Sequence, residues 1–443
     1  MIERDAFQGG AEQDQMGAEM HRLMADLYPI CRSLTGNGVR QTLHMLNDVM
    51  PLVIHEVPTG TTVFDWTVPQ EWNIRDAYIK NSKGDRVVDF QKSNLHVMGY
   101  SVPVSETMSL AELLPRLYSL PEHPEWIPQR ASYYKPNWGF SIAHNDLVRL
   151  AEDRYEVRID STLSNGAMTY GECVIPGEQA DEILFSTHIC HPSLCNDNLS
   201  GIVIAAYLAK AIAAMPKRRY TYRFLFVPAQ LGSLAWLARN QEACGRIRHG
   251  VVLVALGDVG CSTYKCSRRE TAEIDRVVTH VLRHSGQPYE IFKFVPYGYD
   301  ERQYCSPGFN LPVGCFMRST GARFPEYHTS ADNLECVKPS SLADSYRKCM
   351  EICYVLEGNR VFRNLLPNGE PQLGKRGLYG AMGGLAGGGR GKELLLLWAL
   401  NLSDGSHTLL DIAERSGLPF RQVRHAADLL LEHGLLEEVG ESR

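Results

Sequence analysis

The 443-residue chain lacks the features that mark several broad classes of protein. No window approaches the roughly 18 apolar residues that a membrane helix needs, so the sequence predicts no membrane partner. The opening residues, MIERDAFQGGAEQDQMG, are polar and lack the apolar core of a secretion signal. Long runs of like charge are absent and the net charge is only −6, so nothing indicates a basic face for nucleic acid.

Paired cysteine motifs are also missing, although the chain contains 12 cysteines. The cysteines are scattered, with no Cys-X-X-Cys spacing of a zinc or redox motif. In a chain of this size without a secretion signal, free thiols in a cytoplasmic protein are the expected state. The length predicts two or three domains.

Strands and helices alternate from about residue 132 onward. Short apolar runs rich in β-branched and aromatic residues predict strands at 157–161, 171–174, 182–187, 220–228, 249–256, 289–295 and 311–318. Longer amphipathic runs predict helices at 201–215, 233–241, 270–285 and 340–357. This alternation predicts an α/β fold of three layers with a mixed, mostly parallel central sheet.

The segments before and after this region differ from it. Residues 51–130 are rich in Val, Thr, aromatic and turn residues, which predicts a small β-rich domain. Residues 366–391 are dense in glycine and are predicted to be a linker. Residues 392–443 are typical of a helix-turn-helix with a wing. From residue 391 to the end, five basic residues face nine acidic ones, which favours protein contacts or packing over DNA binding.

Metal-type side chains gather in one stretch, ILFSTHICHPSLCNDNLSG at 183–201. An apolar strand runs into a loop that holds His188, His191 and Asp197, and an alanine-rich helix follows. Ligands in open α/β sheets collect at the carboxyl ends of strands. Taken by itself, the stretch is equally compatible with a polar loop around a structural histidine.

Two further residues follow later predicted strands. Asp258 comes after the strand 249–256, and His328 comes after the strand 311–318. Imidazole and carboxylate are the ligands of catalytic zinc sites. Each residue alone is more often structural, but their joint placement at strand ends indicates a metal site.

The order His188…Asp197-Asn-Leu-Ser-Gly…Asp258…Tyr327-His328-Thr resembles the co-catalytic zinc aminopeptidases, a group that includes glutamate carboxypeptidase and glutaminyl cyclase. More closely, the chain resembles an aminopeptidase-like family of bacterial polysaccharide and natural-product gene clusters, often with an appended winged helix. The closer resemblance is carried by the stretches CRSLTGNGVRQTL, STHICHPSLCNDNLSG, GYDERQYCSPGFNLPVG, FPEYHTSADNL and PQLGKRGLYG.

The resemblance implies a role for each ligand. His188 would bind a first metal ion, and Asp197 would bridge two ions or anchor a single one. Asp258 would complete the ligands of a second ion, and His328 would bind the first ion opposite Asp197. The resemblance also implies that 51–130 is inserted into a peptidase-like domain made of 17–50 and 131–365.

The chain departs from the family pattern at Ala229. The family reads Pro-Glu-X-X-Gly-Ser there, and the glutamate is the general base for metal-bound water. This chain reads Pro-Ala-Gln-Leu-Gly-Ser at 228–233. Loss of a base of this kind removes about 10²–10⁴-fold in rate, so we expect impaired hydrolysis. Ala229 is either a natural loss or a deliberate replacement of the kind that traps a substrate.

A second departure concerns the first metal ligand. The family has an aspartate that orients it, and Cys190 occupies that position here. Such supporting contacts change metal affinity by roughly 10–100-fold. The first site is therefore expected to be weak, a single zinc ion is possible, and His191 is an alternative ligand.

Polar side chains cluster again at 300–304. Arg302 is a candidate for a substrate carboxylate, since a guanidinium binds it in bidentate fashion. Asp300 or Glu301 is a candidate for a substrate amine, and Tyr304 completes the candidate substrate site. A salt-bridged loop with no substrate role explains this cluster equally well.

These observations predict a zinc-dependent aminopeptidase-like hydrolase, with one or two zinc ions, that cleaves an amide bond. The expected substrate is a small peptide or an amino-acyl biosynthetic intermediate, and a homo-oligomer is compatible with the sequence. Two alternatives stay open: an amide-forming or cyclising enzyme on the same metal scaffold, and a non-catalytic ligand sensor coupled to the winged helix.

Overall fold

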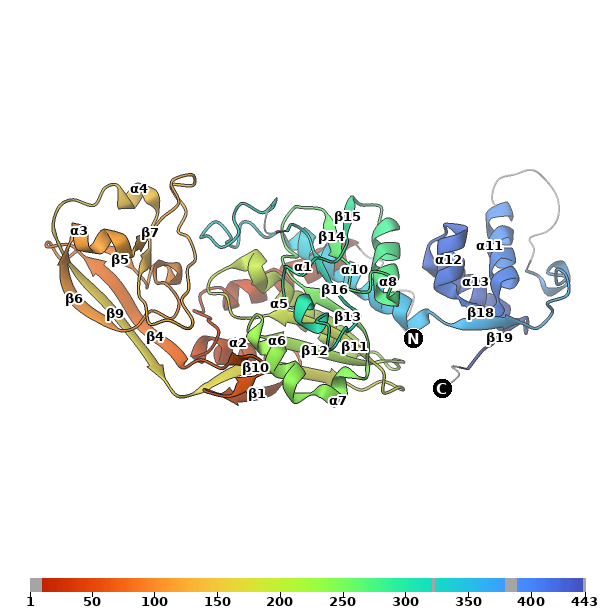
Figure 1. The fold of residues 1–443 in the computed structure, drawn as a ribbon. Helices are drawn as coiled ribbons and strands as arrows, with labels where there is room; N and C mark the ends of the chain where they lie inside the picture. The colour runs from red at the N-terminus through yellow and green to blue at the C-terminus, as the bar shows by residue number, and fades with distance from the viewer. Residues whose placement is uncertain (1–9, 321–322, 379–388, 441–443) are drawn as a thin grey trace. The chain divides into compact units, whose positions relative to one another are not determined.

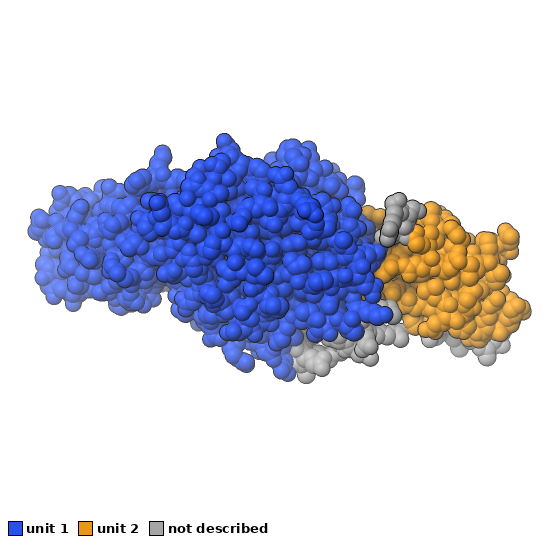
Figure 2. Space-filling view, turned by 90° about the horizontal axis from the view of Figure 1, so that it is seen from below, with its two compact units in different colours: residues 1–275, 288–347 blue, residues 276–287, 348–443 orange. Residues whose placement is uncertain are grey.

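The computed structural model describes residues 10–320, 323–378 and 389–440 (Figure 1). It divides into two compact units, which Figure 2 shows in different colours. The larger unit holds residues 1–275 and 288–347, and the smaller unit holds residues 276–287 and 348–443. Within the described ranges, no helix is both long and apolar enough to cross a membrane.

The larger unit is built on an eight-stranded mixed sheet. In sheet order its strands are β1 (Val53–Pro58), β10 (Ala167–Ile175), β12 (Thr221–Val227), β11 (Glu182–His188), β13 (Ile247–Leu253), β16 (Val313–Met317), β14 (Ser262–Lys265) and β15 (Tyr289–Phe292). The four central strands, β12, β11, β13 and β16, are parallel to one another. Every residue of β11 and β16 is buried, as expected for parallel strands covered on both faces.

The chain order reverses at β11. From β11 the chain passes through α5 (Ser200–Ala213) to β12 on one side, and from β12 through α6 (Leu231–Arg239) to β13 on the other side. Crossovers between parallel strands are right-handed, so α5 and α6 cover opposite faces of the sheet. A reversal of this kind opens a crevice at the carboxyl ends of the strands, where ligands bind.

Of the other described helices, α1 (Gly10–Leu27) packs on α5 and α2 (Asn37–Asn47) packs on β10, while α8 (Glu273–Arg283) and α10 (Pro339–Gly358) each run from the larger unit into the smaller one. Two short helices are α7 (Gln241–Cys244) and α9 (Glu301–Tyr304).

A second, smaller sheet also belongs to the larger unit (Figure 1). Its strands, in sheet order, are β5 (Arg86–Asp89), β4 (Glu71–Lys80), β9 (Arg154–Ser164) and β6 (Val104–Ser109). Short elements accompany it: β2 (Thr62–Val63), β3 (Trp66–Thr67), α3 (Leu110–Leu113), β7 (Leu117–Tyr118), β8 (Phe140–Ser141) and α4 (His144–Leu147).

The chain leaves the large sheet after β1 and re-enters it at β10. These two strands pair antiparallel up to Pro58 opposite Ala167, and the backbone N–H of Thr59 donates to the carbonyl of Gly166 over 2.9 Å. The bounds 51 and 130 of the inserted domain stay a prediction. In the structure, β1 belongs to the large sheet and β9 to the small one, because both strands find their hydrogen-bond partners there.

Besides its parts of α8 and α10, the described residues of the smaller unit form three helices and a three-stranded sheet. They are α11 (Gly389–Leu402), α12 (Leu409–Ser416), α13 (Phe420–Glu432), β17 (Val361–Asn364), β18 (Asp404–Thr408) and β19 (Leu436–Glu438). Thr408 caps α12 reciprocally with Asp411, and Gly417 ends it with a left-handed φ of 70°. This confirms the predicted winged helix, and the mixed sheet and extra β-rich part confirm the predicted fold class.

The glycine-dense linker predicted at 366–391 falls partly outside the described residues, which omit 379–388. Of its described part, Gly374–Arg376 forms a 3₁₀ turn and the helix α11 begins at Gly389.

Candidate metal centre

The loop after β11 is held in place by a buried carboxylate from a distant part of the chain. Asp332 accepts hydrogen bonds from the backbone N–H groups of Cys195 and Asp197, over 3.1 and 2.9 Å, and also from that of Asn196. Asp332 is fully buried, so these donors have no water to bind in its place. The loop conformation, and with it the direction of Asp197, therefore depends on Asp332.

Asp197 is the centre of a cluster of imidazoles. Its Oδ1 lies 2.9 Å from Nε2 of His188, and its Oδ2 lies 2.9 Å from Nε2 of His328. The Nε2 atom of His191 lies 3.8 Å from the same Oδ2. The ligand atoms of His188, His191 and Asp197 all lie within 4.8 Å of one another.

These separations lie near those expected around a zinc ion. Zinc binds nitrogen and oxygen ligands at about 2.0–2.2 Å in a tetrahedron, which places the ligand atoms roughly 3–3.5 Å apart. His188, His191 and Asp197 are a donor set that zinc accepts. His328 lies against Oδ2 of Asp197 and is 34 % exposed, so one side of the cluster is open. The residues present therefore fit a single zinc ion.

The protonation states also suit a metal site. Burial raises the pKa of Asp197, but the neighbouring histidines, His191 first, outweigh burial and hold it well below its usual range. Burial lowers the pKa of His191 to about 3. At neutral pH the cluster therefore offers an ionised carboxylate and a neutral His191 ring, the forms that bind a metal ion.

Two residues around the cluster have a left-handed backbone that is costly for a side chain. His328 has a φ of 56°, and Gln230, after β12, has a φ of 63°. Such conformations cost about 1–3 kcal/mol and gather at functional sites. Their presence in two loops beside the cluster is independent support for a site here.

Asp258 is placed differently from the other predicted ligands. It is buried, and its carboxylate accepts hydrogen bonds from the side chains of Asn196 and Ser319 over 2.7 and 2.8 Å, and from the backbone of Gly260. The described metal-type side chains whose ligand atoms all lie within reach of one another are His188, His191 and Asp197, so this group contains neither Asp258 nor His328. Its role as ligand of a second ion stays a prediction.

Ala229 lies beside the metal loop. Its backbone N–H donates to Sγ of Cys190 over 3.1 Å, and that sulfur lies 3.6 Å from Nδ1 of His191. The position of the expected general base is therefore next to the candidate ligands. Cys190 contacts His191, rather than His188, through its side chain.

The cluster at 300–304 separates into two groups. Asp300 is fully buried, and its Oδ1 accepts hydrogen bonds from the backbone of Gln230 over 2.7 Å and from Ser233 over 2.8 Å. Its Oδ2 has no hydrogen-bond partner among the described residues. Asp300 is thus tied to the same turn as Ala229, with one oxygen free.

The remaining members of this cluster are engaged elsewhere. Glu301 forms a buried ion pair with Lys265, and the Tyr304 hydroxyl bonds to that of Ser186 over 2.9 Å. Arg302 lies over the ring of Tyr297, 6.0 Å from its centroid. The structure ties Asp300 to the turn that holds Ala229, and it places Glu301 and Tyr304 in the packed interior.

The sequence analysis gave no role to Asp332 or to the aromatic rings beside the cluster. Tyr299 stacks on His188 with ring centroids 5.7 Å apart, and Tyr327 stacks on His328 at 3.9 Å. Each tyrosine directly precedes a predicted site residue, Asp300 or His328, and this adjacency in the sequence was the signal that could have found them. Nothing in the spacing of Asp332 indicates that it binds a loop some 135 residues earlier.

Comparison with known proteins agrees with this fold. Residues 21–359 match the model of a family described as a domain of unknown function (DUF4910), and residues 360–438 match a winged helix-turn-helix model. A Clostridium acetobutylicum protein, provisionally named a polysaccharide biosynthesis protein with an aminopeptidase-like domain, is 51 % identical over 425 residues, covering 96 % of this chain and 97 % of its own.

Solved structures show the same relationship. A Clostridium acetobutylicum crystal structure, provisionally titled a peptidase, has 49 % identity and a TM-score of 0.92, covering 97 % of this chain and 98 % of that one. A zinc aminopeptidase from Bacillus subtilis shares the fold at 10 % identity, with a TM-score of 0.57 over 78 % of this chain and 94 % of that one. With 339 consecutive residues matching its model, the chain belongs to the family described as DUF4910, an aminopeptidase-like domain followed here by a winged helix.

Proposed function

We propose that the chain is a metal-dependent, aminopeptidase-like hydrolase that binds one zinc ion and acts on an amide bond. The observation that carries this proposal is the position of Asp197 between His188 and His328, with His191 beside it. The likeness to a zinc aminopeptidase supports the choice of metal. The name of the C. acetobutylicum relative supports an amino-acyl intermediate of biosynthesis, rather than a general protein substrate.

When bound, the zinc ion would polarise the amide carbonyl and activate water. Asp300 would then bind the substrate amine, since its free carboxylate oxygen is buried and tied to the turn beside the metal loop. The tyrosines stacked on the histidines would hold their rings in place. Ala229 supplies no base, so proton transfer is the step that this chain performs poorly.

Metal analysis tests the binding part of the proposal. After loading with zinc and removal of excess, the chain should retain about one ion per molecule, and Asp197→Asn should retain far less. Two tightly held ions would contradict the single-ion centre. A chain that retains no zinc would contradict the proposed function.

Restoring the base tests the catalytic part. Ala229→Glu should raise the rate of hydrolysis of a dipeptide panel, and Ala229→Gln, of the same size but without a base, should not. Equal rates in the two variants would contradict the assignment of position 229.

The smaller unit is proposed to serve protein contacts or packing. The arginines of α13 that a DNA-reading helix would present are engaged within the unit: Arg421 pairs with Glu351, and Arg424 with Asp428 over 2.9 Å. Phosphate binding requires free basic groups, so these pairs favour a role other than DNA recognition.

A further inference from the structure

A buried arginine beside the metal loop lacks a counter-charge. Arg32 is 1 % exposed; its Nε donates to the carbonyl of His191 over 2.9 Å, and its Nη1 donates to that of Leu27 over 2.7 Å. Its Nη2 has no partner, and no carboxylate forms an ion pair with it in the described part of the chain. A buried charge without a partner is costly, so its retention calls for an explanation.

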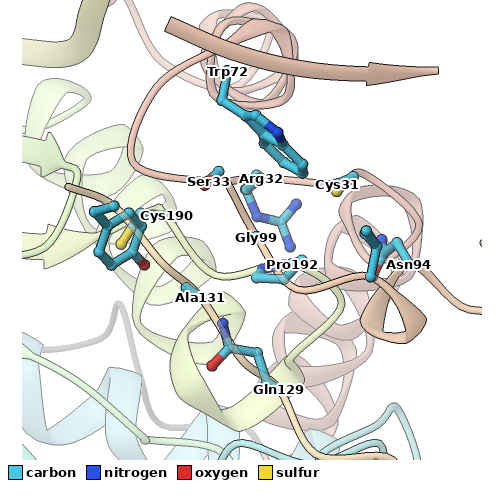
Figure 3. Close-up of a pocket in the computed structure, with 12 residues that line it drawn as sticks. Cys31, Arg32, Ser33, Trp72, Asn94, Gly99, Gln129, Ala131, Cys190 and Pro192 are labelled. Carbon is cyan, nitrogen blue, oxygen red and sulfur yellow. The ribbon is translucent and has the colours of Figure 1, made fainter. Parts of the chain in front are cut away.

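Arg32 lines a cavity that adjoins the candidate ligands. The cavity is small and partly open to solvent, with free space for about one water molecule. It is lined by Cys31, Arg32, Ser33, Trp72, Asn94, Val97, Gly99, Gln129, Ala131, Tyr133, Cys190 and Pro192. In Figure 3 the Arg32 guanidinium lies between Trp72 and Pro192, with Cys190 on one side and Asn94 on the other. The two residues that flank His191 in the chain therefore form one wall.

We propose that this cavity binds a carboxylate of the substrate, so that the amides recognised at the metal centre carry a free carboxylate. This inference rests on the proposed function, because only an enzyme has a substrate. The affinity of the cavity for a carboxylate can be measured independently of that function. The Nη2 group offers two N–H donors and a positive charge, which a carboxylate oxygen accepts well. The chain links the cavity to the cluster through Cys190-His191-Pro192, so one small molecule could contact both.

The chemistry of the lining favours a small anion. The Oδ1 atom of Asn94 also lacks a partner. Its amide can donate to the second carboxylate oxygen if the side chain is turned, and Trp72 provides an apolar wall for the adjoining carbon atoms. Dipeptides and N-acyl amino acids have this composition. A structural arginine would instead be neutralised by a neighbouring acidic side chain.

The test is calorimetric binding, which needs no turnover, and Ala229 helps because it slows hydrolysis. Glycyl-alanine and its C-terminal amide are titrated into the zinc-loaded chain, and acetate and inorganic phosphate into the metal-free chain. We expect glycyl-alanine to bind about 10- to 100-fold more tightly than its amide, the range of a charged hydrogen bond. Acetate should bind the metal-free chain, and phosphate should bind less well.

Arg32→Gln should abolish the preference for the acid, and Arg75→Gln, a matched change in an exposed pair with Asp160, should not. If Arg32→Gln fails to fold, Asn94→Asp replaces it: a carboxylate placed in the cavity should repel the ligand and weaken binding similarly.

Equal binding of acid and amide, or an unchanged preference in both cavity variants, would overturn the inference, as would tighter binding of phosphate than of acetate. A chain that holds no zinc contradicts the proposed function, yet acetate binding that is lost in Arg32→Gln would still support the cavity.

Discussion

Zinc binding should stabilise the larger unit by an amount that can be worked out in advance. At a free zinc concentration of 100 times Kd, a ligand that binds only the folded state adds about 2.7 kcal/mol. The larger unit has roughly 335 residues, which at about 2.1 cal/mol/K per residue gives an unfolding entropy of roughly 0.7 kcal/mol/K. The expected rise in Tm is therefore about 4 °C.

Differential scanning calorimetry of the metal-free chain, with and without zinc, measures this rise. Asp197→Asn should remove the rise, because the charged oxygens between His188 and His328 are lost. Asp258→Asn should keep it, since Asp258 lies outside the cluster of ligand atoms. A rise that survives in Asp197→Asn, or that disappears in Asp258→Asn, would refute the single-ion centre.

Three other changes give measurable outcomes. Ala229→Glu should raise kcat/KM for dipeptides by about 10²-fold or more, compared with Ala229→Gln. Asp332→Ala leaves buried N–H groups without partners, so it should lower the free energy of unfolding in urea titrations by about 2–5 kcal/mol. It should also weaken zinc binding, whereas a purely local role of Asp332 would leave the zinc affinity unchanged. Burial lowers the pKa of His280 to about 4, and its Nε2 accepts from the N–H of Phe420. Since this pKa is depressed, the stability from neutral His280 is complete above pH 6.5 and is lost as pH falls towards 4. Between pH 7 and 5, the free energy of unfolding should change less steeply with pH in His280→Gln than in the unmodified chain, by at most about 1.4 kcal/mol per pH unit. An equal slope in the two proteins would contradict this.

The general position of the site was predictable from sequence because it depends on where strands end. An apolar strand followed by His188 and Asp197 predicts polar groups at a sheet edge, and the structure places them there. The fold class was predictable for the same reason, since alternating strands and helices leave few arrangements.

Residues that act through distant contacts could not be placed by such reasoning. Whether His191 or Asp258 joins Asp197 depends on the path of one loop, which the carboxylate of Asp332 sets from another part of the chain. Arg32 is ordinary in sequence, and only its burial without an acidic partner singles it out.

The pairing of β1 with β10 brings together the two ends of the segment that carries the small sheet. The chain between Thr59 and Gly166 leaves and returns at one point, where a tight turn could join the two strands directly. All four candidate ligands lie outside this excursion, whereas Trp72 and Asn94 within it line the Arg32 cavity. The excursion also reaches the candidate ligands, because the backbone N–H of Gln129 donates to the carbonyl of His328 over 2.8 Å and Pro128 forms a β-bridge with Thr329. A change in this one segment would therefore be felt both in the Arg32 cavity and in the backbone that positions His328.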